Sequence, residues 1–198
     1  QQWTSNAYLL TLGSLLLIGG SLGDVFGERR VFLAGVVGFG VTSILCAVAP
    51  TIELLVAARA LQGVAGALLT PAALAVIVNT FPPDLRGRAI GSWTAWAGIG
   101  AVLGPLVGGQ IVDNASWRWI FAINVPLLVL TLVLASRVMA GEERTRRGKV
   151  DLVGAGLCAT GLAGMTYGLI EQPLKGFGDP LVFVPLVGGA LSFGAFLA

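Results

Sequence analysis

Residues 52–78 read IELLVAARALQGVAGALLTPAALAVIV, and this stretch decides the fold. It exceeds the ~20 apolar residues with which a helix crosses a bilayer core of about 30 Å. The only charge well inside it is Arg59, and a charge at depth costs about 2.5–3.5 kcal/mol on insertion scales. The stretch therefore predicts a membrane-spanning helix that carries a candidate functional residue.

Six further segments meet the same standard or come close to it. Together with the first, the expected membrane spans are residues 3–22, 31–49, 52–78, 89–112, 119–136, 152–170 and 181–198. Lipid offers no partners to backbone N–H and C=O groups, so these segments are expected to be helices. The alternating ~10-residue segments of a β-barrel are absent from the sequence. The predicted fold class is an all-α, polytopic membrane bundle of about seven transmembrane helices.

The composition excludes several classes of protein. Only 11% of the 198 residues are charged and 56% are hydrophobic, whereas soluble domains are near 25% charged. The net charge of +2 gives no basic surface for nucleic acid. Without His, neither a Cys/His metal cluster nor a Ser/His nucleophile pair can form. Val150 after Lys149 rules out a phosphate-binding Walker loop. We therefore expect a protein that is not an enzyme and has no cofactor or metal.

Positive charge is concentrated in alternate loops. Residues 24–30, 82–88 and 137–151 hold nine of the twelve Lys and Arg residues. By the positive-inside rule these three loops are expected to be cytoplasmic. The sequence therefore predicts a multi-pass protein of the cell's inner membrane whose first span begins outside.

The first of these loops is rich in glycine. Residues 20–30 read GSLGDVFGERR, and glycines at 20, 23 and 27 would allow a tight turn with positive φ where needed. Asp24 and Arg29 are placed to pair with each other or with neighbouring helix ends. The alternative is a solvated loop that merely carries positive-inside charge.

The third span has both polar and small residues on one face. Gln62 and Gly63 follow Arg59 one helical turn later on the same face, which favours a functional arginine that faces a cavity. The alternative is an arginine that extends its side chain to the membrane interface. Gly63 and Gly66 with Ala67 predict close approach of a neighbouring helix. Pro71 is expected to kink this helix.

The fourth span carries an unusual glycine stripe. Residues four apart stack on one helix face, so a neighbouring backbone could approach closely along this stripe, and the proline would bend the helix there. Ordinary helix–helix packing is the alternative. The residues of this pattern are Gly91, Gly100, Gly104, Pro105, Gly108 and Gly109.

These stretches resemble three ordered patterns of the major facilitator superfamily, specifically its fourteen-helix drug:proton antiporter branch. The pattern G-x-L-A-D-R-x-G-R-K is met by Gly20, Leu22, Asp24, Gly27 and Arg29, with departures at Val25 and Glu28. The pattern L-x-x-x-R-x-x-Q-G-x-G is met by Leu55, Arg59, Gln62 and Gly63, with Ala65 in place of the last glycine. The antiporter pattern G-x8-G-x3-G-P-x2-G-G is met in full from Gly91 to Gly109. Residues 117–126, WRWIFAINVP, also resemble the start of the sixth family helix.

The resemblance implies a division of the chain. Residues 1–136 would be the N-terminal transporter bundle without its first helix, 137–151 a cytoplasmic basic loop, and 152–198 two extra linking helices. The chain would then cover family helices two to eight. The first family helix and the C-terminal bundle of the parent chain would be its partners.

The resemblance also implies roles and a function. Asp24 and Arg29, with Gly20 and Gly27, would form a cytoplasmic latch. Arg59, with Gln62 and Gly63, would respond to protonation of an acid in the first family helix. The glycine stripe would form the seam between two bundles. The expected function is proton-coupled antiport that exports amphiphilic drugs through the lipid bilayer. The alternatives are a facilitator or symporter of another small solute, and a truncated fragment that is inactive alone.

Overall fold

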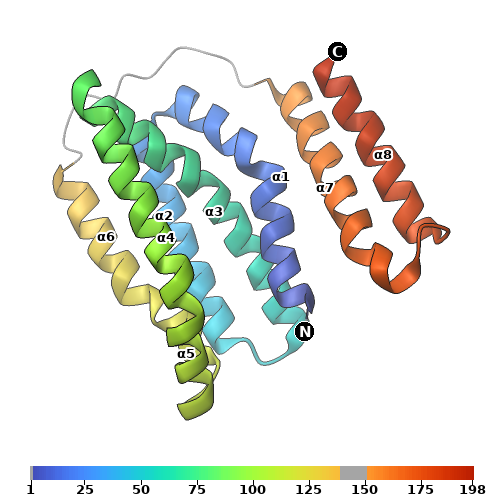
Figure 1. Ribbon diagram of the computed structural model, residues 1–198, viewed down its shortest axis with the longest axis horizontal. Coiled ribbons are helices and arrows are strands. Elements are labelled where there is room, and N and C mark those ends of the chain that lie inside the picture. The colour runs from blue at the N-terminus through green and yellow to red at the C-terminus, as the bar shows by residue number, and fades with distance from the viewer. Residues whose placement is uncertain (1, 139–150) are drawn as a thin grey trace.

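The computed structural model describes residues 2–138 and 151–198, and within them the chain is helical throughout, with no strand. Seven of its segments are long and apolar enough to cross a membrane, which confirms the expected all-α, polytopic bundle. The helices are α1 (Gln2–Phe26), α2 (Glu28–Val48), α3 (Ile52–Thr80), α4 (Pro83–Asn114), α5 (Arg118–Ala122), α6 (Asn124–Val138), α7 (Leu152–Lys175) and α8 (Pro180–Leu197) (Figure 1).

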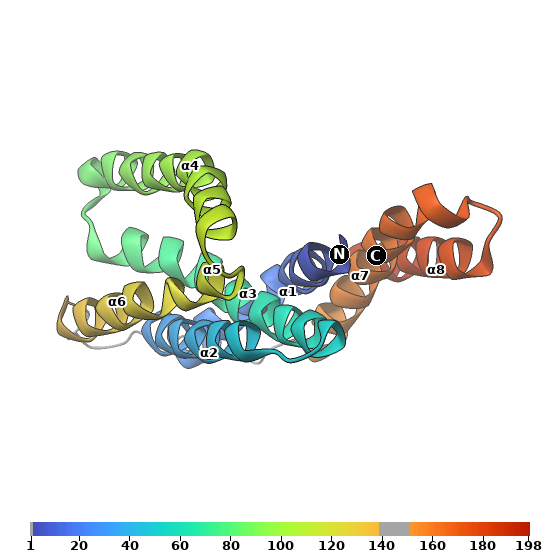
Figure 2. The same ribbon diagram turned by 90° about the horizontal axis from the view of Figure 1, so that it is seen from below.

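The helices form three groups. α3 packs along both α1 and α2, and α5 and α6 lie against α2. α7 and α8 form an antiparallel pair whose α7 contacts α1. α4 stands apart from these layers and approaches only the end of α3 and α5 (Figure 2). The bundle core therefore lies among α1, α2 and α3.

The junction of α1 and α2 is shorter than the predicted loop 24–30. α1 continues to Phe26 and α2 begins at Glu28, so Gly27 alone interrupts the helices. Its φ of 93° is a conformation that other residues rarely adopt. Gly20 and Gly23 remain helical, so the expected tight turn with positive φ is formed at Gly27, which alone of the three requires the conformational freedom of glycine.

The predicted loop 82–88 is also mostly helix. α3 ends at Thr80 and α4 begins at Pro83, directly after Pro82 in the N-cap position. Proline suits the first helical position because its missing N–H would have no partner there and its φ is already helical. Arg86 then donates through Nε to the carbonyl of Phe81 over 3.0 Å, which caps the end of α3.

Two further departures from the predicted spans occur near prolines. The span 119–136 is divided into α5 and α6. Pro126 has no N–H to offer the carbonyl four residues earlier, which accounts for the break. α7, in contrast, runs through Pro173 to Lys175, so Glu171 lies in a helix and outside the loop expected after residue 170. Pro105 lies inside α4, which is visibly bent in Figure 2.

The pair α7–α8 is packed through small residues. A Cβ added to Gly164 would lie 2.6 Å from the carbonyl oxygen of Pro185, and one on Gly161 would lie 2.8 Å from Phe193. The hydroxyls of Thr160 and Ser192 are 2.8 Å apart. Contacts this close make the pair a well-packed unit by itself.

Candidate functional site

Arg59 is held between helices at the centre of a polar cluster. Its Nε donates to the carbonyl oxygen of Thr4 on α1 over 3.0 Å, and its Nη1 donates to Oε1 of Gln62 over 2.6 Å. The guanidinium carbon lies 4.3 Å from the ring centroid of Tyr8 and 5.7 Å from that of Phe121. A cation within about 6 Å of a ring face is attracted to it. The half-buried arginine is thus bound by α1, α3 and α5.

Gln62 extends this cluster to α2. Its Nε2 donates to Oγ of Ser43 over 2.7 Å, and the thiol of Cys46 lies 3.9 Å from its Oε1. Gln62 is 1% exposed, and Ser43 and Cys46 are 0% exposed. Hydrogen bonds in such dry surroundings are stronger than in water, and breaking them is correspondingly costly. The chain Arg59–Gln62–Ser43 therefore links three helices through buried polar contacts.

The charge of Arg59 has only neutral partners in the part of the chain that the structure describes. Its hydrogen bonds go to a backbone carbonyl and an amide, and its rings come from Tyr8 and Phe121. The titratable groups that face it are Tyr8 of α1 and Cys46 of α2. No carboxylate of residues 2–138 or 151–198 forms an ion pair with it. A buried cation of this kind is a candidate functional group.

Gly63 and Gly66 bring α1 against α3, as the sequence predicted. A Cβ on Gly63 would overlap the hydroxyl of Thr11 and the carbonyl of Tyr8, and one on Gly66 would lie 2.7 Å from a methyl group of Leu12. At the same place Thr11 Oγ1 donates to the carbonyl oxygen of Ala60 over 2.8 Å. The close helix approach expected from the small residues is confirmed, and it places Tyr8 over Arg59.

The predicted latch residues are arranged differently from the expectation. Asp24 and Arg29 form no ion pair with each other or with a helix end among the described residues. Instead Asn79 of α3 donates a hydrogen bond to the carboxylate of Glu28. Asp24 and Glu28, one turn apart in sequence and separated by Gly27, line a hollow of about 600 Å³ against α3. The expected Asp24–Arg29 pairing was wrong because Glu28 makes the contact between α2 and α3.

The glycine stripe of α4 has no neighbour among the described residues. A Cβ added to any of its five glycines would meet no atom within 4 Å. No residue of α4 is buried, and Leu103 and Leu106 beside Pro105 are exposed. The close helix approach expected at this stripe therefore involves nothing in residues 2–138 or 151–198.

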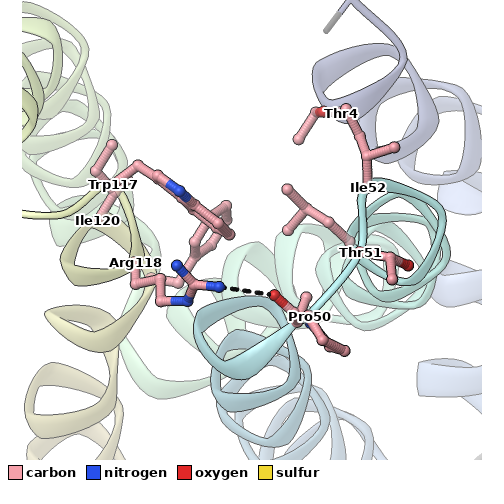
Figure 3. Close-up of a pocket in the computed structure, with 10 residues that line it drawn as sticks. Thr4, Pro50, Thr51, Ile52, Trp117, Arg118 and Ile120 are labelled. Carbon is pink, nitrogen blue, oxygen red and sulfur yellow. Dashed lines mark hydrogen bonds between the residues drawn. The ribbon is translucent and has the colours of Figure 1, made fainter.

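A hollow of about 480 Å³ opens beside the Arg59 cluster, between α1, α5 and the α2–α3 connection (Figure 3). Thr4 and Phe121, which both contact Arg59, line it. Arg118 borders it and donates through Nη2 to the carbonyl oxygen of Ala49 over 3.2 Å, with its guanidinium 4.6 Å from the Trp117 ring. The hollow and the Arg59 cluster therefore share Thr4 and Phe121.

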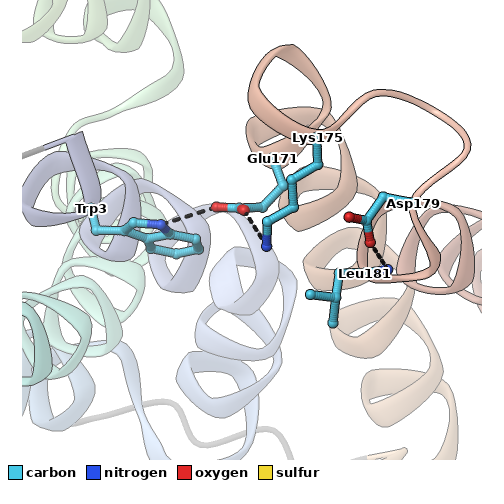
Figure 4. A network of polar contacts seen from close by, with 5 residues as sticks. All are labelled: Trp3, Glu171, Lys175, Asp179 and Leu181. Atoms are coloured by element: carbon cyan, nitrogen blue, oxygen red, sulfur yellow. Dashed lines mark hydrogen bonds and ion pairs between the residues drawn. The ribbon is translucent and has the colours of Figure 1, made fainter.

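A second polar cluster joins α7 to α1 (Figure 4). Nε1 of Trp3 donates to Oε1 of Glu171 over 3.0 Å, and Nζ of Lys175 lies 2.9 Å from the other carboxylate oxygen. The rings of Trp3 and Tyr167 are 5.6 Å apart. Glu171 is 5% exposed, so its charge is balanced by Lys175 and its position is tied to α1.

Comparison with known proteins assigns the family. The sequence pattern of the Major Facilitator Superfamily matches residues 1–198. The chain belongs to this superfamily. As a major facilitator protein it is a multi-pass membrane protein surrounded by the lipid bilayer.

Its relatives in the superfamily carry names of resistance and export. The chain is 44% identical to the puromycin resistance protein of Streptomyces alboniger, over 99% of this chain and 39% of the relative. It is 41% identical to the cephamycin export protein of Amycolatopsis lactamdurans, over 99% of this chain and 41% of that relative. It is 37% identical to the tetracenomycin C resistance and export protein of Streptomyces glaucescens, over 98% of this chain and 36% of that relative. The chain thus spans well under half the length of these relatives.

Several residues of this major facilitator site were not predicted from the sequence. The polar cluster includes Thr4, Tyr8, Ser43 and Phe121, which come from α1, α2 and α5. The tyrosine and the hydroxyl residues of long apolar segments were the available signal, because buried polar groups in a bilayer need partners. The contacts themselves depend on how the helices are rotated against one another, which one sequence does not specify.

Proposed function

We propose that the full-length protein is a secondary transporter that exports small amphiphilic molecules in exchange for protons. The names of its relatives, which concern resistance to and export of antibiotics, support an exporter. The observation that carries the proton-coupling part is the half-buried Arg59, whose partners among the described residues are all neutral. Such a cation is suited to respond to a carboxylate that gains and loses a proton.

The coupling follows from electrostatics. A cation near a carboxylate stabilises its ionised form and so lowers its pKa. In the proposed cycle a carboxylate elsewhere in the full-length protein approaches Arg59 when ionised and leaves it when protonated. Gln62 and Gly63 support this role, because Gln62 orients the guanidinium and Gly63 lets α1 bring Tyr8 over it.

The other predicted regions have proposed roles in the same cycle. Residues 1–136 would form one bundle and 152–198 a linking pair, with 137–151 between them outside the described residues. Asp24 and Gly27 would form a latch on the cytoplasmic side of the inner membrane, now with Glu28 and Asn79 included. Further helices of the full-length chain would cover the stripe of α4. Alternating access would be rocking of one bundle against the other.

The test is Arg59→Ala in the full-length protein, with ethidium as the transported probe. We expect inverted membrane vesicles to accumulate ethidium in response to a proton gradient, and the variant to lose at least about tenfold in rate. Arg137→Ala is the matched control, since Arg137 is exposed at the end of α6 and outside the Arg59 cluster, and it should retain the wild-type rate.

Two outcomes would contradict the proposal. Proton-driven ethidium transport at the wild-type rate by Arg59→Ala would remove the coupling role of this residue. Transport by the wild-type protein that continues unchanged after an ionophore collapses the gradient would indicate a facilitator, the alternative function on this fold.

A further inference from the structure

Ser43 of α2 is fully buried at the end of the polar chain that begins at Arg59. Its Oγ accepts a hydrogen bond from Gln62 Nε2 over 2.7 Å. The adjacent Thr42 is also buried, but its hydroxyl donates to carbonyl oxygens of its own helix, at Gly38 over 2.8 Å and Phe39 over 3.1 Å. Of these two neighbouring hydroxyls, Ser43 is the one that contacts another helix.

The hydrogen bonds fix the orientation of the Gln62 amide. An arginine has donors and no acceptor, so the amide oxygen must face Arg59 and the NH2 group must face away from it. On that far side the NH2 group needs an acceptor, because an unsatisfied buried donor costs free energy. Ser43 Oγ is the acceptor that the structure supplies there.

We propose that Ser43 is a positioning residue for Arg59, acting through Gln62. It holds the amide with its oxygen toward the guanidinium and so fixes the direction in which the remaining guanidinium donors point. This inference rests on the proposed role of Arg59 in proton coupling. It adds a residue of α2, outside the three sequence patterns, to the group that sets the proton affinity of the transporter.

The surroundings of Arg59 make the direction of its guanidinium depend on Gln62. On α1 it faces the carbonyl of Thr4 and the ring of Tyr8, and on α5 the ring of Phe121. The titratable groups that face it are Tyr8 and Cys46, and within the described ranges no charged side chain joins them. Gln62 Oε1 is therefore the side-chain oxygen that directs this guanidinium.

The first test is the pH profile of ethidium transport by full-length Ser43→Ala. A guanidinium held less firmly stabilises a carboxylate less, so the midpoint of the profile should move toward higher pH by about 0.5 unit. Thr42→Ala, which removes a buried hydroxyl one residue away, should keep the wild-type midpoint. A Ser43→Ala midpoint equal to that of Thr42→Ala would overturn the proposal.

A double-mutant cycle separates positioning from general loosening of the bundle. In a Gln62→Met background, Ser43→Ala should cause no further shift, because its effect passes through the amide. Both Gln62→Met proteins lose the amide oxygen that accepts from Arg59 and Cys46, so this loss is common to the two and cancels in the comparison. A shift of the same size in both backgrounds would show that Ser43 acts by another route and would overturn the inference.

Cys46 gives a readout that needs no transport. Its thiol lies 3.9 Å from Gln62 Oε1 and is fully buried. In full-length protein with Cys46 as the sole cysteine, N-ethylmaleimide should label Ser43→Ala about fivefold faster than wild type, and Thr42→Ala at the wild-type rate. If wild-type protein shows no proton-driven transport, the proposed function fails, and Cys46 labelling still decides whether Ser43 holds Gln62. Equal labelling of all three proteins would overturn that contact.

Discussion

α3 and α4 are both long, glycine-containing helices with one internal proline, yet their surroundings are opposite. The glycines of α3 lie against α1, and its arginine, glutamine and alanines are packed or hydrogen-bonded. α4 buries no residue, and its glycines face open space among the residues described. Glycines therefore pack against a neighbouring helix in α3, whereas those of α4 contact no neighbour among the described residues.

This difference shows which of the two helices has a packing reason for its glycines. Glycine inside a helix is destabilising by roughly 0.5–1 kcal/mol relative to alanine. In α3 the close approach of α1 offsets this, because a methyl group at Gly63 has no room. In α4 the described neighbours give no such reason. We therefore propose that transport, or contact with other helices of the full-length protein, requires the stripe, and three experiments test this contrast.

The largest effect is expected for Gly63→Ala. The new methyl group would overlap Thr11 and the backbone of Tyr8, so α1 would have to move away from α3. Overpacking of this kind typically costs about 1–3 kcal/mol, and we expect the upper end here. Thermal unfolding in detergent measures it. Gly13→Ala on α1, where a Cβ meets nothing within 4 Å, is the control and should be neutral or slightly stabilising. Equal unfolding temperatures for the two variants would break the contrast.

Gly104→Leu tests the other side of the comparison. It should leave membrane insertion of residues 1–198 unchanged, because a Cβ at this position meets no described atom within 4 Å. In full-length protein it should reduce ethidium transport at least about tenfold, equivalent to ~1.4 kcal/mol. Gly98→Leu places the same side chain on another face of α4 and should retain transport. Full activity of Gly104→Leu would reduce the stripe to a sequence feature without a role in transport.

The smallest effect is expected for Thr11→Val, which sharpens the account of α3. It keeps the shape of the side chain and removes the hydrogen bond to Ala60. Interhelical hydrogen bonds in membranes average about 0.6 kcal/mol, so a small fall in unfolding temperature is expected. Thr131→Val is the control. The Thr131 hydroxyl bonds only within its own helix, so this variant should not lower the unfolding temperature. A loss as large as that of Gly63→Ala would mean that hydrogen bonding, and not close packing, holds α1 to α3.

The sequence was sufficient for the seven spans and for the position of Arg59 within one of them. A membrane span depends on the hydropathy of about 20 consecutive residues, so it can be predicted from local sequence alone. Helix ends were less predictable, since α7 continues through Pro173, whereas the chain breaks between α5 and α6 shortly before Pro126. The partners of Arg59 on other helices were not predictable, because Thr4 and Phe121 contact it only through the rotation and spacing of separate helices. The Asp24–Arg29 pairing failed for the same reason.

The pairing of Glu171 with Lys175 has a consequence for how the chain enters the membrane. With the basic residues 137–151 on the cytoplasmic side, as the sequence predicts, the turn of the α7–α8 hairpin must cross the bilayer, and Glu171, Lys175 and Asp179 all lie at or beside that turn. A single charge near the middle of the bilayer costs about 2.5–3.5 kcal/mol on insertion scales. Two opposite charges one helical turn apart and 2.9 Å from each other can cross as a neutral pair. In this predicted orientation the hairpin brings a counter-ion for Glu171 with it, so this carboxylate would reach Trp3 already balanced.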